Sequence, residues 1–266
     1  MLMLQKGEGK NGAGAASSAA AATLGCQSNV GRVRRHNEDS FAAREDLGLW
    51  VVADGMGGAA AGEIASAIVV DVVSREVERG AELHDAIAAA NRSILDAAAR
   101  GKGKPGMGST VVAAQLQGND FKVAWVGDAR AYVWGDGLQR LSRDHSRVQE
   151  LLDAGMISES EARGHPHRNV ITRVLGGPDG TAADSDQITG SLEPGQGLLL
   201  CSDGLTSEVS DEEIAGVLSG HLQANGLESD QGQAAVDQLV SLALDHGGND
   251  NITVLLVGLA ADGARP

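Results

Sequence analysis

Residues 49–58 read LWVVADGMGG, an apolar run that ends in a carboxylate and a glycine-rich turn. A short, Val-rich run bounded by glycine indicates a buried β-strand. A carboxylate at the mouth of such a strand is held rigidly and is costly to leave unpaired. The stretch therefore predicts a strand that delivers Asp54 to a site with a positively charged occupant.

Three more aspartates border short apolar runs in the same way. Asp128 follows the run 123–126, Asp203 follows the run 198–201, and Asp250 precedes a run that begins at Ile252. One such residue could belong to a turn, whereas several of them indicate carboxylates that converge on a cation. Hard divalent cations such as Mg²⁺ and Mn²⁺ prefer oxygen ligands, so they are the expected occupants.

The composition excludes several classes of function. The chain has 266 residues that are 42% hydrophobic but only 2% aromatic, so its core must be mainly aliphatic. A formal net charge of −15 argues against nucleic acid and anionic membranes as main partners. Cys26 and Cys201 form no CxxC pair or disulfide framework, which favours a reducing, cytoplasmic setting. No stretch approaches the roughly 18–20 apolar residues that span a bilayer.

The chain divides into a leader, one folded domain and a tail. Residues 1–22 are rich in Gly, Ala and Ser, and we expect a disordered leader there. The folded domain is expected over residues 23–260, with no linker and no internal repeat, and residues 261–266 are expected to form a tail. No signal favours an oligomer, so a monomer is expected.

The order of the periodic segments predicts an α+β fold. Strands are expected near 23–29, 39–43, 47–53, 109–117, 121–127, 130–134, 197–202 and 252–259. Helices are expected at 62–79, 82–100, 146–154, 158–163, 210–220 and 232–245. This order differs from the regular alternation of a Rossmann fold. It favours two sheets packed on each other with helix pairs outside.

Two of the expected helices have a clear apolar face. In 62–79 the face consists of Ile64, Ile68, Val69, Val72, Val73 and Val77. In 82–100 the inward residues are Leu83, Ile87, Ile94 and Leu95. Each face predicts a helix that lies against a sheet.

Several polar motifs are ambiguous when taken singly. The stretch 31–40, GRVRRHNEDS, alone favours a surface cluster of salt bridges. In an extended chain, however, Arg34 and Glu38 point the same way, and an arginine fork suits phosphate oxygens. The glycine-rich turn after Asp54 lacks the Lys-Ser/Thr of a phosphate loop, and the Asn-Asp-Asn run at 249–251 is by default a polar turn.

Taken together and in order, these motifs resemble the bacterial branch of the PP2C (PPM) family of metal-dependent protein serine/threonine phosphatases. The matching motifs are RxxNEDS at 34–40, ADGMGG at 53–58, GMGST at 106–110, VGDxRAY at 126–132, CSDGL at 201–205 and DNIT at 250–253. The resemblance covers residues 23–258. It implies a four-layer α-β-β-α sandwich whose two central antiparallel β-sheets are flanked by helix pairs.

The resemblance also implies a role for each matched residue. Asp54 would bridge two Mn²⁺ or Mg²⁺ ions, with Asp203 and Asp250 completing the first site. Glu38 and the Gly55 carbonyl would serve the second ion, supported by Asp39. Asp128 and Asp203 would hold the third ion of bacterial members, so two or three ions are expected. Arg34 would bind the phosphate, and residues 144–173 would form a mobile flap beside the cleft.

The implied reaction is hydrolysis of phosphoserine or phosphothreonine on proteins by a water or hydroxide that bridges the two metals. Two metals can lower the pKa of that water, and no covalent phospho-enzyme is needed. Arg34, Asp54 and Asp203 are the residues implied to be catalytic. The implied partners are phosphoproteins, among them a bacterial serine/threonine protein kinase that the enzyme would oppose.

Three positions depart from the wider family. Met56 stands where eukaryotic members have the histidine proposed as general acid, and Ala59 replaces a histidine common in bacterial members. Ala129 replaces a serine and removes a hydroxyl but no ligand. The proton donor is left open between a metal-bound water and His145, for which an ordinary structural role is favoured.

Three other functions compete with this interpretation. A haloacid-dehalogenase-type phosphatase needs a DxD motif after a strand, but Asp184 and Asp186 follow a polar segment. A catalytically inactive relative that only binds phosphoproteins would have lost metal ligands, and all of the matched ones are present. Sigma-factor-regulating phosphatases of this fold carry sensor domains, for which the chain has no room.

Overall fold

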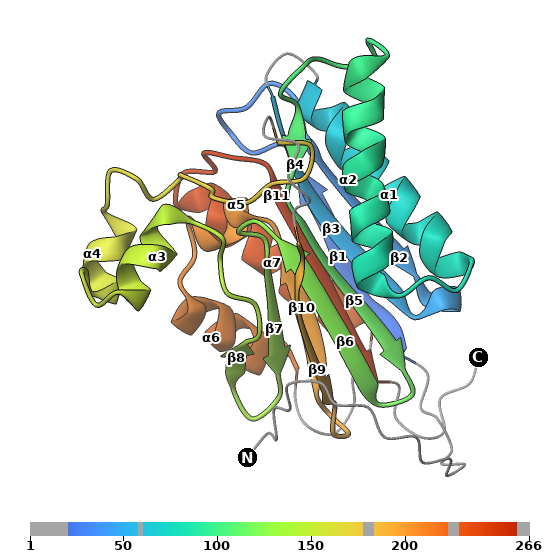
Figure 1. Ribbon diagram of the computed structural model, residues 1–266. Helices are drawn as coiled ribbons and strands as arrows, with labels where there is room; N and C mark the ends of the chain where they lie inside the picture. The colour runs from blue at the N-terminus through green and yellow to red at the C-terminus, as the bar shows by residue number, and fades with distance from the viewer. Residues whose placement is uncertain (1–20, 58–60, 178–183, 223–228, 260–266) are drawn as a thin grey trace.

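The computed structural model describes residues 21–57, 61–177, 184–222 and 229–259 (Figure 1). Two antiparallel β-sheets pack face to face, and helices cover the outer face of each sheet. The predicted α+β, four-layer α-β-β-α sandwich is confirmed. The expected leader and tail lie outside the described residues, except that Ala21 and Ala22 already belong to the first strand.

The first sheet has six strands and carries two of the aspartates. Its path is β2-β3-β5-β6-β9, and the short β4 pairs with β3. The register sets Asp39 opposite Asp54, so both carboxylates lie at the same end of the sheet. The strands are β2 Asp39–Arg44, β3 Leu49–Met56, β4 Gly108–Ser109, β5 Val111–Gln117, β6 Asp120–Val126 and β9 Asp186–Ser191.

The second sheet has five strands in the order β1-β11-β10-β7-β8. Its central strands β10 and β11 are buried along their whole length, which explains their continuous apolar sequence. Asp203 follows β10 and Asp250 precedes β11, so both lie at one end of this antiparallel pair. The strands are β1 Ala21–Asn29, β7 Arg130–Trp134, β8 Leu138–Arg140, β10 Gly197–Cys201 and β11 Ile252–Leu259.

The space between the sheets is filled by one apolar cluster. Trp50, Phe121 and Trp125 of the six-stranded sheet pack with aliphatic residues such as Leu200 and Leu255 of the other sheet. Because these side chains are almost completely buried, the two sheets form a rigid platform for the residues at their ends.

Helix pairs form the outer layers. Helices α1 (Ala61–Glu78) and α2 (Leu83–Ala99) cover the six-stranded sheet. Helices α6 (Asp211–His221) and α7 (Ser229–Asp245) cover the five-stranded sheet. The remaining helices are short: η1 (Glu45–Leu47), α3 (Arg147–Asp153), α4 (Glu159–Arg163) and α5 (Asp203–Thr206).

The prediction of which residues form the inner face of helix α1 was wrong at the first turn of the helix. Ile64 is 36% exposed, whereas Ala61, Gly62 and Ala65 are buried. A Cβ on Gly62 would lie 2.7 Å from the Gly55 carbonyl carbon, so only small residues allow the helix to approach strand β3. Further along, Val69, Val72, Val73 and Val77 are buried as predicted.

Two edge strands escaped the sequence prediction. Strand β9 has one large aliphatic residue, Ile188, and strand β8 has only three residues. Each pairs with a single neighbour at the border of its sheet, so little apolar surface is needed to hold it. Asp186 is the first residue of β9 and Asp184 precedes it by two positions, so these carboxylates lie at the start of a strand.

Helices α3 and α4 lie beside the sandwich and belong to the segment expected to be a flap (Figure 1). An antiparallel bridge between Ser146 and Ile171 joins the two ends of this segment. Among the helices of the described ranges, none combines the length and apolar character needed to cross a membrane.

Candidate metal centre

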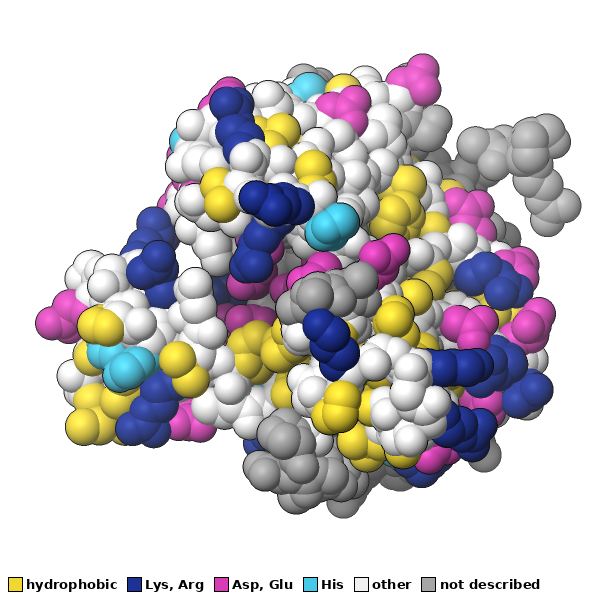
Figure 2. All heavy atoms as spheres, turned by 90° about the horizontal axis from the view of Figure 1, so that it is seen from above, with side chains coloured by type: hydrophobic (Ala, Val, Ile, Leu, Met, Phe, Trp, Pro, Cys, Tyr) yellow, Lys and Arg dark blue, Asp and Glu magenta, His cyan; other side chains and the backbone are white. Residues whose placement is uncertain are grey.

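The carboxylates predicted from the sequence meet at one end of the sandwich. Asp39 and Asp54 come from the six-stranded sheet, and Asp203 and Asp250 border strands of the other. Asp128 lies in the connection from β6 to β7, where the chain passes between the sheets. Figure 2 looks onto this end, where acidic side chains lie in a central hollow with Lys and Arg side chains around it.

Mutual proximity and burial change the acidity of these groups. Burial raises the pKa of Asp54 well above its ordinary value, and the charges of Asp39 and Asp203 add to this effect. Burial likewise raises the pKa of Asp203, and the charges of Asp128 and Asp250 add to this effect. Asp54 and Asp203 retain a partly exposed edge, as expected of carboxyls in the floor of a cleft that are otherwise surrounded by protein.

Two further carboxyls in the cluster also have raised pKa values. Burial, opposed by hydrogen bonds from Thr253 and Ser202, raises the pKa of Asp39 to about 6. Burial and the charge of Asp144 raise the pKa of Asp128 to about 7. The ionised carboxylates of the cluster therefore repel one another, and a bound cation would reduce this repulsion.

The chemistry of the cluster fits divalent metal ions. One oxygen of each of Asp39, Asp128 and Asp203 is buried without a hydrogen-bond partner in the described part of the chain. Such orphaned carboxylate oxygens are costly unless an ion or water satisfies them. Within the described ranges, no three His, Cys, Asp or Glu side chains already surround a single point as ligands. The all-oxygen donor set nevertheless suits Mg²⁺ and Mn²⁺.

Glu38 and Gly55 lie together beside the first turn of α1. The Gly55 amide donates to the Glu38 carbonyl at 3.1 Å, and a Cβ on Gly62 would lie 2.8 Å from the Glu38 carboxyl carbon. A Cβ on Gly55 itself would lie 2.1 Å from the Gly62 carbonyl oxygen, so this position requires glycine. The close packing explains the glycine-rich turn after Asp54.

Arg34 stands at the mouth of the hollow. Its Nη2 atom donates to Oδ2 of Asp250 at 2.6 Å, and this hydrogen bond raises the pKa of the guanidinium. The charges of Asp54 and Glu38 act on Arg34 in the same direction. Its side chain remains 52% exposed, so the fork is accessible to an anion from solution.

Asp39 is fixed by two hydroxyls of the five-stranded sheet. Its Oδ2 atom accepts from Ser202 Oγ at 2.8 Å and from Thr253 Oγ1 at 2.7 Å. The Thr253 amide in turn donates to Ser202 Oγ at 2.9 Å. These bonds join the two sheets at the cluster and hold the Asp39 side chain in one orientation.

Asn251 is a site residue that sequence reasoning missed. Its side-chain amide donates to the carbonyls of Val30 and His36, at 2.9 and 3.0 Å. Its Oδ1 atom accepts from the Glu38 amide at 2.8 Å. Asn251 thus ties the loop with Arg34 and Glu38 to the start of β11. The sequence signals were its place beside Asp250 in a polar run and in the matched motif at 250–253, neither of which assigned it a role.

His145 supports the turn that carries Asp128. The Gly127 amide donates to its Nδ1 atom at 3.1 Å, and the His145 amide donates to the Gly127 carbonyl at 2.8 Å. An Nδ1 atom that accepts leaves the proton on Nε2, which lies 3.3 Å from Oδ2 of Asp186. Burial lowers the pKa of the imidazole, so the ring is neutral and both nitrogens are engaged.

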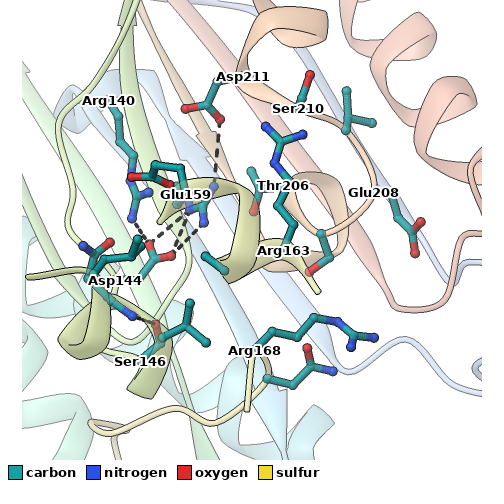
Figure 3. Close-up of a pocket in the computed structure, with 18 of the residues that line it drawn as sticks. Arg140, Asp144, Ser146, Glu159, Arg163, Arg168, Thr206, Glu208, Ser210 and Asp211 are labelled. Atoms are coloured by element: carbon teal, nitrogen blue, oxygen red, sulfur yellow. Dashed lines mark hydrogen bonds and ion pairs between the residues drawn. The ribbon is translucent and has the colours of Figure 1, made fainter. Parts of the chain in front are cut away.

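A polar pocket of about 500 Å³ separates the flap segment from α5 and α6 (Figure 3). On one wall, Arg130 and Arg140 both pair with Asp144, the first residue of that segment. On the opposite side, Arg163 reaches Glu212 of α6 at 3.6 Å. These ion pairs connect the flap segment to the sheet at its base and to α6 at its tip.

Comparison with known proteins identifies the family. A sequence model of the family described as protein phosphatase 2C matches residues 28–241, which is most of the chain. The chain belongs to this family. The phosphatase is 35% identical over 243 residues to the serine/threonine phosphatase stp of Listeria innocua, a match that covers 85% of this chain and 92% of the relative.

Solved structures agree with this assignment. The serine/threonine phosphatase PstP/Ppp of Mycobacterium tuberculosis gives a TM-score of 0.79 at 35% identity, covering 91% of this chain and 98% of that one. A catalytic domain of PstP in complex with two manganese ions gives 0.77 at 32% identity, with the same coverage. The prediction from the motifs is confirmed: this chain is a protein phosphatase of the metal-dependent, serine/threonine-specific family.

Proposed function

We propose that this phosphatase hydrolyses phosphoserine and phosphothreonine on proteins with Mn²⁺ or Mg²⁺ held by the carboxylate cluster. The observation that carries the proposal is the convergence of buried carboxyls with raised pKa values and orphaned oxygens at one end of the sandwich. The two manganese ions of PstP support the choice of metal.

Each residue of the cluster has a proposed role. Asp54, Asp203 and Asp250 would hold one metal ion, and Asp54 with Glu38 and the Gly55 carbonyl would hold a second. Asp128 and Asp203 would hold a third ion, and Asp39 would orient its neighbours through its bonds to the other sheet. When bound, the ions supply Lewis acidity and lower the pKa of water, so that a nucleophile exists at neutral pH.

Arg34 is the proposed phosphate-binding residue. Its exposed fork can form two parallel hydrogen bonds with phosphoryl oxygens and offset their charge. His145 does not fit the role of proton donor to the leaving oxygen, because its Nε2–H is directed to Asp186 and its Nδ1 atom to Gly127. We assign it to positioning of the Asp128 turn.

We further propose that the substrates include a serine/threonine protein kinase, and that the enzyme acts as a monomer in the cytoplasm. The two free thiols, Cys26 and Cys201, suit a reducing compartment. Co-incubation with such a kinase should remove phosphate from its activating residues. Unchanged kinase phosphorylation would exclude this partner, and sedimentation at twice the mass of one chain would exclude the monomer.

The activity itself is tested with p-nitrophenyl phosphate. Turnover should be absent in EDTA, appear with Mn²⁺ and collapse in Asp203→Asn, while Asp71→Asn on the exposed face of α1 serves as the matched control. A folded protein with no turnover in Mn²⁺ or Mg²⁺ would instead indicate a module that binds phosphoproteins without hydrolysing them.

A further inference from the structure

Cationic side chains are concentrated in a few parts of this acidic chain. It has 21 Lys and Arg against 36 Asp and Glu. Nine of these cations come from three segments without any Asp or Glu, residues 30–37, 97–119 and 162–177. They are Arg32, Arg34, Arg35, Arg100, Lys102, Lys104, Arg163, Arg168 and Arg173.

The three segments meet around the carboxylate cluster. The first is fixed there by the bond of Arg34 to Asp250. The second contains Ser109, which pairs with Gly55 in strand β3. The third is joined to the second, because Ser109 and Leu175 exchange backbone hydrogen bonds of 3.0 and 2.9 Å. The three segments therefore lie near the carboxylate cluster, and Figure 2 shows Lys and Arg side chains around the hollow that holds acidic side chains.

Some of these cations are already neutralised and others are not. Five have acidic partners: Arg32 with Asp245, Arg34 with Asp250, Arg100 with Asp96, Arg163 with Glu212, and Arg173 with Asp186. The other four are exposed and have no ion-pair partner within 4.0 Å in the described part of the chain. We call these four the cationic rim: Arg35, Lys102, Lys104 and Arg168.

We propose that the cationic rim selects phosphoproteins in which acidic residues flank the phosphorylated serine or threonine. The inference rests on the proposed function, since it places the phosphate on Arg34. In an extended peptide, side chains two to four residues from the phosphoresidue lie about 7–13 Å from it. Arg35 adjoins Arg34 in the chain, and Arg168 projects into the pocket between the flap segment and α6 (Figure 3).

The net charge of the protein strengthens this selection. With a formal charge of −15, most of the surface repels an acidic peptide, and the rim offers it one attractive approach. Because the rim cations have no ion-pair partner in the described part of the chain, no existing ion pair has to be broken when the peptide binds. The expected effect is on association and is therefore screened by salt.

The test compares three phosphothreonine peptides of equal length whose flanking positions carry Glu, Gln or Lys. At an ionic strength of about 0.01 M, kcat/KM should be about 3–10 times higher for the Glu peptide than for the Gln peptide, and lowest for the Lys peptide. At about 1 M the three values should converge.

A combined variant locates the effect. Replacing all four rim residues with Gln should bring the Glu-to-Gln ratio close to one and leave hydrolysis of p-nitrophenyl phosphate unchanged. A control with the same change in net charge is placed near or on the outer helices: Arg44→Gln, Arg75→Gln, Arg79→Gln and Arg92→Gln. The control should keep most of the preference for the Glu peptide.

The outcomes separate the inference from the function on which it rests. Equal rates for the three peptides at low salt, or an equal loss of preference in rim and control variants, would overturn the cationic rim while leaving a working phosphatase. Absence of p-nitrophenyl phosphate hydrolysis in the wild type with Mn²⁺ would instead overturn the proposed function.

Discussion

Asp128→Asn should stabilise the metal-free protein at alkaline pH. The pKa of Asp128 rises from an ordinary 3.8 to about 7 in the folded chain. Because the folded-state value is the higher one, ionisation of this buried carboxyl destabilises the fold, and the loss grows as pH rises from about 4 to about 7. The cost is about 2 kcal/mol at about pH 5 and about 4 kcal/mol at about pH 8.

The amide in the variant removes the charge but keeps the shape. An imperfectly bonded Asn costs about 1–2 kcal/mol, so the variant should be about 2–3 kcal/mol more stable than the wild type in EDTA at about pH 8. Near pH 5 the two proteins should differ by less than about 1 kcal/mol. Urea titration followed by circular dichroism measures both values.

Added Mn²⁺ should then reduce this difference in stability. A ligand at about 100 times its dissociation constant stabilises the folded state by about 2.7 kcal/mol, and the variant should lose part of this gain. Asp71→Asn is the control, because its side chain is 72% exposed and its free energy of unfolding should change by less than about 0.5 kcal/mol. If Asp128→Asn in EDTA were less stable than the wild type at about pH 8, the proposed electrostatic strain would be refuted.

Three other substitutions test the surroundings of the cluster. Asn251→Ala removes three hydrogen bonds and should lower the free energy of unfolding by about 2–4 kcal/mol in urea titration. Gly204→Ala would place a Cβ 2.0 Å from the Asn251 carbonyl oxygen, so its melting temperature should fall by several degrees, corresponding to about 1–3 kcal/mol. Arg34→Ala should lower kcat/KM for p-nitrophenyl phosphate by about 10²–10³-fold, while stability changes by less than about 1 kcal/mol because its ion pair is exposed.

Each of these expectations has a contrary result. An Asn251→Ala protein as stable as the wild type would mean that the loop with Arg34 is held by other contacts. An unchanged melting temperature for Gly204→Ala would mean that α5 can move away from β11 at no cost. Undiminished hydrolysis by Arg34→Ala would remove Arg34 from the proposed phosphate site.

The sequence was sufficient for the layers of the fold because its periodicities are long. Continuous apolar runs predicted strands β10 and β11, and the spacing of Val69, Val72 and Val73 predicted helix α1. Strands β8 and β9 were missed because an edge strand can be held by backbone bonds to one neighbour. The first turn of α1 was misjudged because close approach to Gly55, which periodicity does not report, excludes Ile64 from the inner face.

Within the site, Asp54, Asp128, Asp203 and Asp250 could be found because each one stands at the border of an apolar run, whereas Glu38 and Asp39 were found through the resemblance of their motif. Their common location then followed from the resemblance of the motifs. For His145 the sequence favoured a structural role but not its partner, and Asn251 was not given a role, since both act by hydrogen bonds to backbone groups far away in the sequence. Asn251, for example, contacts Val30, which is 221 positions distant. Only the folded chain shows that these residues hold loops in place.

The origin of the carboxylates in both sheets has a mechanical consequence. Asp39 and Asp54 belong to one sheet, Asp203 and Asp250 border the other, and Asp128 lies on the crossing between them. Cations bound by this set would join the two sheets at one end, whereas at the opposite end the sheets are held by apolar packing and by the hydrogen bonds of Thr23 with Trp50 and Glu45. Chelation should therefore make local opening of the two sheets more frequent at the end with the cluster. Amide hydrogen exchange should become faster at the ends of β3 and β11 nearest the cluster and change little at their far ends.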